Sequence, residues 1–276
     1  MSEELDVRPD ETDAPSWRER LKSPSGKVAV GVFGVWVVMT LLLLAFGIWW
    51  PNTLMPPIAS DTAVEVLRTM LVFSVASTPV MALVWAIAYY SIRHWGHGGD
   101  TPPEDGPSIR GNNKVVIVWL LVSSLLCAFL LIWGLAALTK TTTMPPNAQP
   151  LVVKVIGQQW IWSFEYPHDG NIRTATLVVP EGRPVQFLVT STDVIHSFWL
   201  PEMGIKVDAN PLVTTSTFTT PSKVGTFNVR CAELCGLNHA YMQTTVTVMT
   251  PAKYNAWVLS QGGTPSQATA TGASNG

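Results

Sequence analysis

The residues with the clearest chemical potential lie near the C-terminus, where Cys231, Cys235, His239 and Met242 fall within twelve residues. Thiolate and thioether sulfur favour copper, and imidazole suits copper equally well. A further histidine, His196, lies some 35 residues upstream, at the expected end of another strand. We therefore expect a metal site on a loop between β-strands.

The second cysteine distinguishes two kinds of copper site. A one-copper blue site uses two histidines, one cysteine and a weak axial methionine, so it would leave one thiolate spare. A spare thiolate is open to oxidation, whereas two thiolates can bridge two copper ions and share their charge. We expect a dinuclear site with imidazoles from His196 and His239. Met242 then supplies one weak ligand, and a backbone carbonyl near Glu233 supplies the other.

Three other interpretations use the same residues. A disulfide between Cys231 and Cys235 is chemically plausible outside the cytoplasm, but it leaves the neighbouring histidine and methionine without a role. A zinc site with two cysteines and two histidines leaves Met242 unexplained. A copper-delivery or thiol-redox protein could use the Cys-x-x-x-Cys pair with a distant histidine, and it would not need His239 and Met242 in one loop.

The remainder of the chain must place this loop, and its composition points to a membrane. Only 13% of the 276 residues are charged, which is unusual for a soluble protein of this length. The runs 28–50, 69–92 and 115–139 contain no Asp, Glu, Lys or Arg, and each exceeds the roughly 20 residues that cross a bilayer as a helix. We expect three transmembrane helices within residues 28–140. The net charge of −2 gives no sign of a nucleic acid partner.

The distribution of basic residues predicts the orientation in a bacterial-type plasma membrane. Lysines and arginines precede the first run and lie between the second and third, whereas residues 51–66 have none. By the positive-inside rule, segment 1–27 faces the cytoplasm and the C-terminal half lies outside. A cleaved signal peptide is the competing reading of the first run, but its length and the sequence Ile48-Trp-Trp-Pro51 do not resemble one.

The pattern changes after the third run to short β-rich segments broken by proline and glycine. Examples are Leu151 to Ile156, Thr174 to Val179, Val185 to Thr190 and Thr244 to Met249. This spacing is typical of an all-β sandwich or small barrel, which we place at residues 148–260. The remaining residues, 261–276, are rich in Gly, Ser, Thr and Ala and are expected to be disordered.

The motif Cys231-x-Glu-x-Cys-Gly-x-x-His-x-x-Met242 resembles the dinuclear copper (CuA) loop of cytochrome c oxidase subunit II. Two further segments resemble the same family: the aromatic stretch from Gly157 to Tyr166, and His196-Ser-Phe-Trp199 with the loop that follows. The resemblance covers roughly residues 60–260. It implies a cupredoxin-like Greek-key barrel after membrane helices, and it assigns the main-chain oxygen of Glu233 to copper.

The resemblance also implies a function. The chain would take electrons from cytochrome c, with Trp160 as the first acceptor, and pass them to a haem in subunit I, where oxygen is reduced. It would act with subunit I and the other oxidase subunits and have no turnover alone. The matching glutamate, Glu233, would also face a magnesium or manganese ion shared with subunit I.

The chain departs from the family pattern at several positions. Val116 stands where oxidase subunits commonly carry a glutamate at a proton-uptake entrance, Gln158 stands where many members have histidine, and the first apolar run is additional to the usual two-helix hairpin. The missing glutamate leaves open a copper-containing nitric oxide reductase of the same superfamily. Quinol oxidase subunits of this fold typically lack the copper ligands, so the ligands argue against that class.

Overall fold

The computed structural model describes residues 17–95, 111–144 and 146–266. The chain divides into two compact units. The first holds residues up to 53 together with 72–119, and the second holds 54–71 together with the chain from 120 onwards. Most of the segment expected to face the cytoplasm, 1–16, lies outside the described residues.

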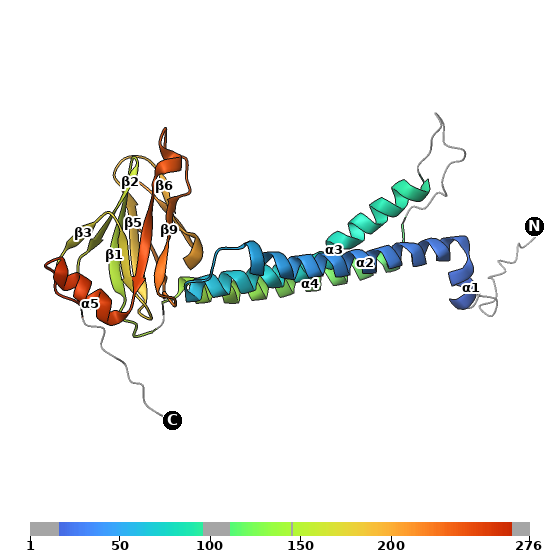
Figure 1. Ribbon diagram of the computed structural model, residues 1–276. Coiled ribbons are helices and arrows are strands. Elements are labelled where there is room, and N and C mark those ends of the chain that lie inside the picture. Colours follow the sequence, from blue (N-terminus) through green and yellow to red (C-terminus); the bar gives the residue numbers. More distant parts are fainter. Residues whose placement is uncertain (1–16, 96–110, 145, 267–276) are drawn as a thin grey trace, which may run out of the picture. The chain divides into compact units, whose positions relative to one another are not determined.

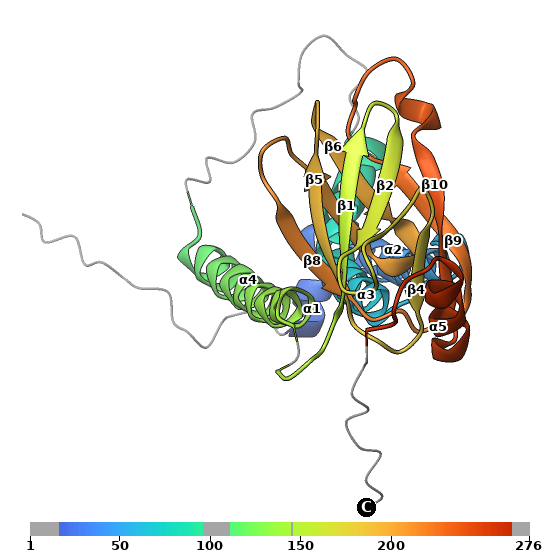
Figure 2. The ribbon, with the colours of Figure 1, turned by 90° about the vertical axis from the view of Figure 1, so that its left-hand side faces the viewer.

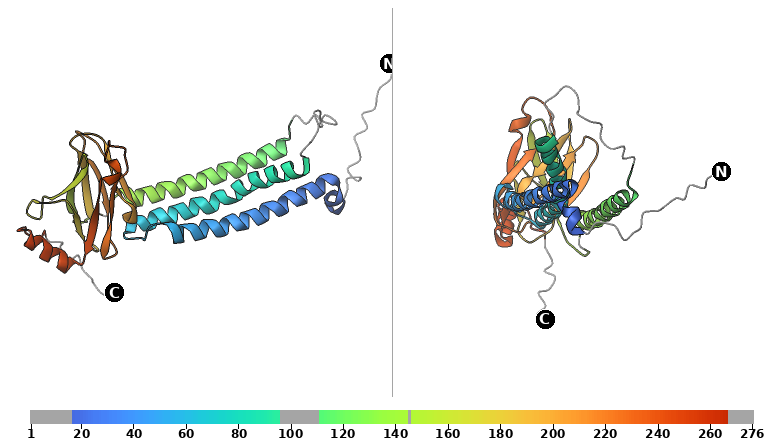
Figure 3. Two further views of the ribbon diagram at one scale, coloured as in Figure 1. Left: turned by 45° about the horizontal axis from the view of Figure 1, so that its top comes forward. Right: turned by 90° about the vertical axis from the view of Figure 1, so that its right-hand side faces the viewer.

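The helical part consists of one short and three long helices. These are α1 (Trp17–Lys22), α2 (Pro24–Leu54), α3 (Asp61–Trp95) and α4 (Asn113–Thr142). Figure 3 shows each long helix as one uninterrupted run. All three are long and apolar enough to cross a membrane, as judged by length and composition. The expectation of three apolar helices is confirmed, and each helix extends beyond the charge-free run that predicted it.

Small residues bring α2 and α3 together in the first unit. Ala82 and Ala86 are fully buried, and a Cβ atom on Gly31 would lie 2.6 Å from the Tyr90 ring. The Trp36 indole N–H donates to the Pro79 carbonyl at 2.8 Å. Close approach through small residues, together with a hydrogen bond between helices, is the usual way in which helices associate in a membrane.

The C-terminal domain is a sandwich of two five-stranded sheets. One sheet has the order β3-β2-β1-β5-β8 and faces the viewer in Figure 2; the other has the order β4-β10-β9-β6-β7. The strand bounds in the first sheet are β1 (Leu151–Gln158), β2 (Ile161–Tyr166), β3 (Ile172–Thr174), β5 (Val185–Ser191) and β8 (Thr215–Thr219). Those in the second are β4 (Leu177–Pro180), β6 (His196–Leu200), β7 (Ile205–Ala209), β9 (Gly225–Cys231) and β10 (Gln243–Met249).

Alternating side chains from both sheets form the core. Strand β5 alternates buried and half-buried residues along its whole length, as expected for a strand with one face on a core. Phe198 lies at the centre and contacts the rings of Trp162, Phe164 and Phe187. The predicted strand from Thr174 to Val179 is in fact two strands: β3 ends at Thr174 in one sheet, and β4 begins at Leu177 in the other.

The segment between α2 and α3 is built into the sandwich. Ala59 and Ser60 are fully buried. The Ala59 N–H donates to the Glu202 carbonyl at 2.8 Å, and its own carbonyl accepts from the Ser222 N–H at 2.9 Å. The Ser60 hydroxyl donates to the Met203 carbonyl at 2.8 Å and accepts from the Ala63 N–H, so it caps α3. We call residues 59–63, with their partners, the joint.

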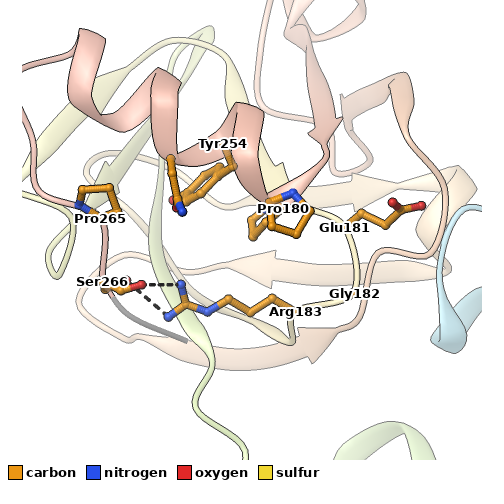
Figure 4. Close-up of a pocket in the computed structure, with 9 residues that line it drawn as sticks. Pro180, Glu181, Gly182, Arg183, Tyr254, Pro265 and Ser266 are labelled. Carbon is orange, nitrogen blue, oxygen red and sulfur yellow. Dashed lines mark hydrogen bonds between the residues drawn. The ribbon is translucent and has the colours of Figure 1, made fainter. Parts of the chain in front are cut away.

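A helix and a short extension close the end of the sandwich opposite the β9–β10 loop. Helix α5 (Pro251–Ser260) was not expected in an all-β domain. After it, the Ser266 N–H donates to the buried Asp169 carboxylate at 2.6 Å, and Arg183 bonds the Ser266 carbonyl at 3.0 Å; Figure 4 shows Arg183 and Ser266 facing each other. Four residues of the tail expected to be disordered, Gln261, Gly262, Gly263 and Ser266, therefore make hydrogen bonds. Residues 267–276 lie outside the described residues.

Candidate metal centre

The β9–β10 connection carries most of the candidate ligands, and Figure 1 shows it as the orange-red loop at one end of the sandwich. Cys231 is the last residue of β9, and a 3-10 turn from His239 to Tyr241 precedes β10. The Cys231 N–H donates to the Met242 carbonyl at 3.0 Å, which closes the base of the loop. Paired strands thus fix both ends of the loop, and the ligands lie between them.

His196 reaches the loop from the neighbouring strand. It is the first residue of β6, so it lies at one end of a strand, as expected from the sequence. Strand β6 pairs with β9, and Phe198 lies opposite Cys231. The histidine is fully buried, and its Nδ1 atom lies 3.9 Å from the Cys231 sulfur.

The remaining distances place the predicted ligands around two sulfur atoms. The Cys231 and Cys235 sulfurs are 3.8 Å apart. His239 Nδ1 lies 3.6 Å from the Cys235 sulfur, and the Met242 sulfur lies 3.8 Å from it. The Glu233 carbonyl oxygen lies 3.2 Å from the Cys231 sulfur. Each cysteine sulfur therefore has its own imidazole and its own weak donor.

These spacings are those of a metal-binding set. Two ligand atoms at about 2.0–2.3 Å from one tetrahedral ion lie roughly 3.3–3.8 Å apart. The sulfur–sulfur distance of 3.8 Å and the Cys235–His239 distance of 3.6 Å lie in this range, and the Cys231–His196 distance of 3.9 Å lies just above it. The donors also suit copper, since soft sulfur and imidazole dominate the set. The residues present therefore fit a copper centre of the kind that the motif implies.

The two loop cysteines are not joined in a disulfide, which also fits a metal site. Both are free, and their separation of 3.8 Å is well beyond a sulfur–sulfur bond. Burial and, next, the neighbouring Cys231 raise the pKa of Cys235 to about 11. Two thiolates at this distance repel each other, and a bound cation reverses that balance.

Asp193 contacts a candidate ligand, and the sequence analysis did not identify it. Its Oδ1 atom lies 2.9 Å from His196 Nε2, so it accepts from the ring nitrogen that faces away from the sulfurs. Burial alone would raise the pKa of Asp193, but hydrogen bonds from the Gln159 backbone, His196, the Val194 backbone and Ser191 lower it to about 2. An ionised carboxylate here fixes the ring orientation of a ligating histidine. The Asp-x-x-His spacing was the available signal.

The β1–β2 turn covers the other side of the loop. The Gln159 amide donates to the Cys235 carbonyl at 2.7 Å, and the Trp160 indole N–H donates to the same oxygen at 3.3 Å. Trp160 directly precedes β2, is half-buried, and packs against the edge of the core that holds Trp162, Phe164 and Tyr166. The structure thus joins Trp160 to the main chain of a candidate ligand, and Gln159 is a second contact that the sequence analysis missed.

Glu233 contributes differently from the other candidates. Its carbonyl lies within the sulfur cluster, whereas the residue as a whole is exposed. Met242 and Cys235 are buried, and His239 is half-buried. All six predicted ligands therefore come together, with the Glu233 side chain outside the cluster.

The family model and the similar proteins all name the same family. The family described as cytochrome C oxidase subunit II, periplasmic domain, matches residues 173–249. Cytochrome c oxidase subunit 2 of Thermostichus vulcanus is 32% identical over 273 residues, which cover 80% of this chain and 82% of that protein. A probable cytochrome c oxidase subunit 2 of Rickettsia felis is 24% identical and covers 92% of this chain and 85% of its own length.

A solved structure is also similar to the β domain. The periplasmic domain of subunit II of cytochrome oxidase from Bradyrhizobium japonicum shares 33% sequence identity, covers 43% of this chain and 97% of its own, and has a TM-score of 0.41. The family match supports a cupredoxin-like assignment for the observed sandwich. Because the Thermostichus protein matches about four fifths of both chains at 32% identity, this chain belongs to the cytochrome c oxidase subunit 2 family, whose members are subunits of haem–copper terminal oxidases.

Proposed function

We propose that this chain is the electron-input subunit of a respiratory terminal oxidase, which accepts electrons from cytochrome c at a dinuclear copper (CuA) centre and passes them to a haem in subunit I. The observation that carries the proposal is the arrangement of two sulfurs 3.8 Å apart, each with a separate imidazole within 3.9 Å. A disulfide or a single zinc ion does not require this arrangement. Two bridged copper ions supply one-electron transfer with little change of geometry.

The residues have separate tasks in this proposal. Cys231 and Cys235 would hold both metals, His196 and His239 would supply the imidazoles, and Met242 and the Glu233 carbonyl would be the weak ligands. Because His196 is fully buried and held by Asp193, its ring is oriented before any metal binds. A ligand set fixed in advance suits electron transfer, since little has to move when the charge changes.

Trp160 is the proposed point of electron uptake from the donor. Its indole N–H contacts the Cys235 carbonyl, so a single hydrogen bond links its ring to the backbone of a bridging cysteine. The exposed Glu233 side chain is available to a magnesium or manganese ion shared with subunit I. The three charge-free membrane runs hold no Asp, Glu, Lys or Arg, so we assign them no part in proton conduction.

The proposed arrangement in the cell follows from the helices and the basic residues. Segment 1–27 lies in the cytoplasm, the helices cross the bacterial plasma membrane, and the domain from 148 to 260 lies outside. The match of residues 173–249 to a periplasmic domain family supports this orientation. The relatives reported above are named as oxidase subunits and give no support to a nitric oxide reductase.

Copper binding tests the proposal directly. The full chain, purified in detergent and supplied with copper, is expected to bind two copper ions and to give an EPR spectrum with hyperfine coupling to two nuclei. Cys231→Ser should lose this signal, whereas Cys127→Ser, at an exposed cysteine of α4, should keep it. One copper with a single-nucleus pattern would show that the dinuclear assignment is wrong.

The same preparation separates the other interpretations. Thiol titration that finds Cys231 and Cys235 joined in air-stable protein would favour a structural disulfide. A single tightly bound zinc ion would favour a zinc site. Ready transfer of copper to a thiol chelator would favour a delivery protein, because a permanent centre should retain its metal.

A further inference from the structure

A charged cluster lies where two apolar helices meet the β domain. The Glu65 carboxylate accepts from Lys140 Nζ at 3.2 Å and from Arg68 at 3.4 Å. Glu65 and Arg68 lie just before the charge-free run 69–92 of α3, and Lys140 lies just after the charge-free run 115–139 of α4. The cluster therefore occupies the boundary between hydrocarbon and headgroups on the side of the β domain.

A groove begins directly beneath this cluster. Its volume is about 290 Å³, and it lies between α3 and α4 within the second unit. The lining residues are Glu65, Val66, Thr69, Met70, Gly134, Ala137, Leu138 and Thr141. Apart from Glu65 and two threonines these are small or apolar, and Gly134 and Ala137 leave room that larger side chains would fill. The groove thus has a charged rim and an apolar floor.

The rim carries unused hydrogen-bond donors. Lys140 and Arg68 are more than half exposed, whereas the Glu65 side chain is 13% exposed. A lysine has three donors and an arginine has five, and each uses only one on Glu65. With two cations and one carboxylate, the rim has a net charge of +1 and suits an anionic group.

We propose that this groove binds one anionic phospholipid of the leaflet next to the β domain. The phosphate receives hydrogen bonds from Arg68 and Lys140, and one acyl chain lies over Gly134 and Ala137. Basic pockets between membrane helices on the cytoplasmic side bind anionic headgroups, and the same attraction between a cation and a phosphate applies on the side of the β domain. Glu65 holds the two cations in place and does not contact the lipid phosphate. The inference rests on the membrane-spanning assignment and is independent of copper binding.

Lipid retention by the isolated oxidase complex tests this proposal. The complex that contains the full chain is exchanged into equal amounts of phosphatidylglycerol and phosphatidylcholine, and the lipids retained are counted by native mass spectrometry. We expect one phosphatidylglycerol per chain. Lys140→Gln should weaken its retention about fivefold, since a cation near the headgroups contributes about that factor. Lys114→Gln, at the other end of the same helix, should have no effect.

A second variant tests the apolar part of the groove. Ala137→Phe fills the floor and should abolish retention while the copper EPR signal stays unchanged. Equal retention of both lipids, or full retention in Lys140→Gln, would overturn the proposal. A photoreactive side chain at position 138 that cross-links to subunit I and not to lipid would also overturn it, because a protein partner would then occupy the groove.

Discussion

At the scale of single residues, the candidate metal centre depends on partners that hold the ligands as much as on the ligands themselves. Asp193 joins His196 to the β1–β2 turn, since one carboxylate oxygen accepts from the ring and the other accepts from the Gln159 N–H at 2.7 Å. Removing its charge should weaken the orientation of the histidine and leave the shape of the site intact.

We predict that Asp193→Asn lowers copper affinity about 10- to 100-fold, the usual effect of losing a partner of a ligating histidine. Competition with a copper chelator measures the affinity, and thermal unfolding checks the fold. Glu181→Gln makes the same charge change at the opposite end of the domain and should leave affinity unchanged. Equal affinity in Asp193→Asn and wild type would remove Asp193 from its positioning role.

Met242→Leu tests the weak ligand. The side chains have similar volumes, so the fold should lose less than about 1.5 kcal/mol, while the loss of the sulfur should shift the reduction potential of the copper centre. Met203→Leu is the matched control, because Met203 is equally buried but lies outside the centre. Potentiometry that finds the same potential in Met242→Leu and wild type would exclude Met242 as a ligand.

At the scale of elements, the joint is the feature that ties the β domain to a membrane helix. Ser60 caps α3 and bonds Met203, which is 143 residues further along the chain. Asp61 adds to the same contact, since its carboxylate accepts from the Thr220 N–H at 2.8 Å and from the Thr219 hydroxyl at 3.1 Å. One short segment thus caps helix α3 and also bonds the end of β8, the edge strand of the first sheet.

We predict that Ser60→Ala lowers the free energy of unfolding of the β domain by about 1–2 kcal/mol, because a helix cap and a buried hydrogen bond are lost together. Ser222→Ala removes an exposed hydroxyl in the same joint and keeps the backbone N–H that bonds Ala59. Denaturation followed by tryptophan fluorescence compares the two. A smaller loss in Ser60→Ala than in Ser222→Ala would contradict this account.

The elements that the sequence predicted best are those with a local signal. The three long helices follow from runs without charge, and the metal loop follows from four rare residues close together. Contacts between distant residues had no such signal. The joint pairs residue 59 with 202 and 222, and the division of Thr174–Val179 depends on which sheet accepts each half. Asp193 and Gln159 act through contacts that spacing alone does not specify.

At the scale of the whole molecule, the face around the candidate centre is apolar. Exposed apolar residues lie close in sequence to its ligands or to Trp160: Ile161, Val194, Ile195, Leu234, Leu237 and Tyr241, with exposures between 39% and 90%. We call this set the apolar collar. Seven acidic and seven basic residues balance in the β domain as a whole. A donor that docks on this face should therefore depend on apolar contact more than on charge.

We predict that electron transfer from cytochrome c to the centre changes little between low and physiological salt, because few charges are available for screening. Leu237→Asp should slow the second-order rate several-fold. Leu259→Asp makes the same change at another exposed leucine, on α5 at the opposite end of the domain, and should have no effect. Stopped-flow rates that fall steeply with salt would contradict an apolar docking face.

The joint also has a consequence for the order of biogenesis. Residues 59–63 leave the ribosome about ninety residues before the first strand of the sandwich, which begins at Leu151, yet the backbone of Ala59 has its partners at Glu202 and Ser222. Water must solvate those peptide groups until the late strands arrive. The segment between the first two long helices thus gains its hydrogen-bond partners only after residue 222 has been made. A nascent chain truncated before that point would lack the contacts that hold the start of its second long helix against the β domain.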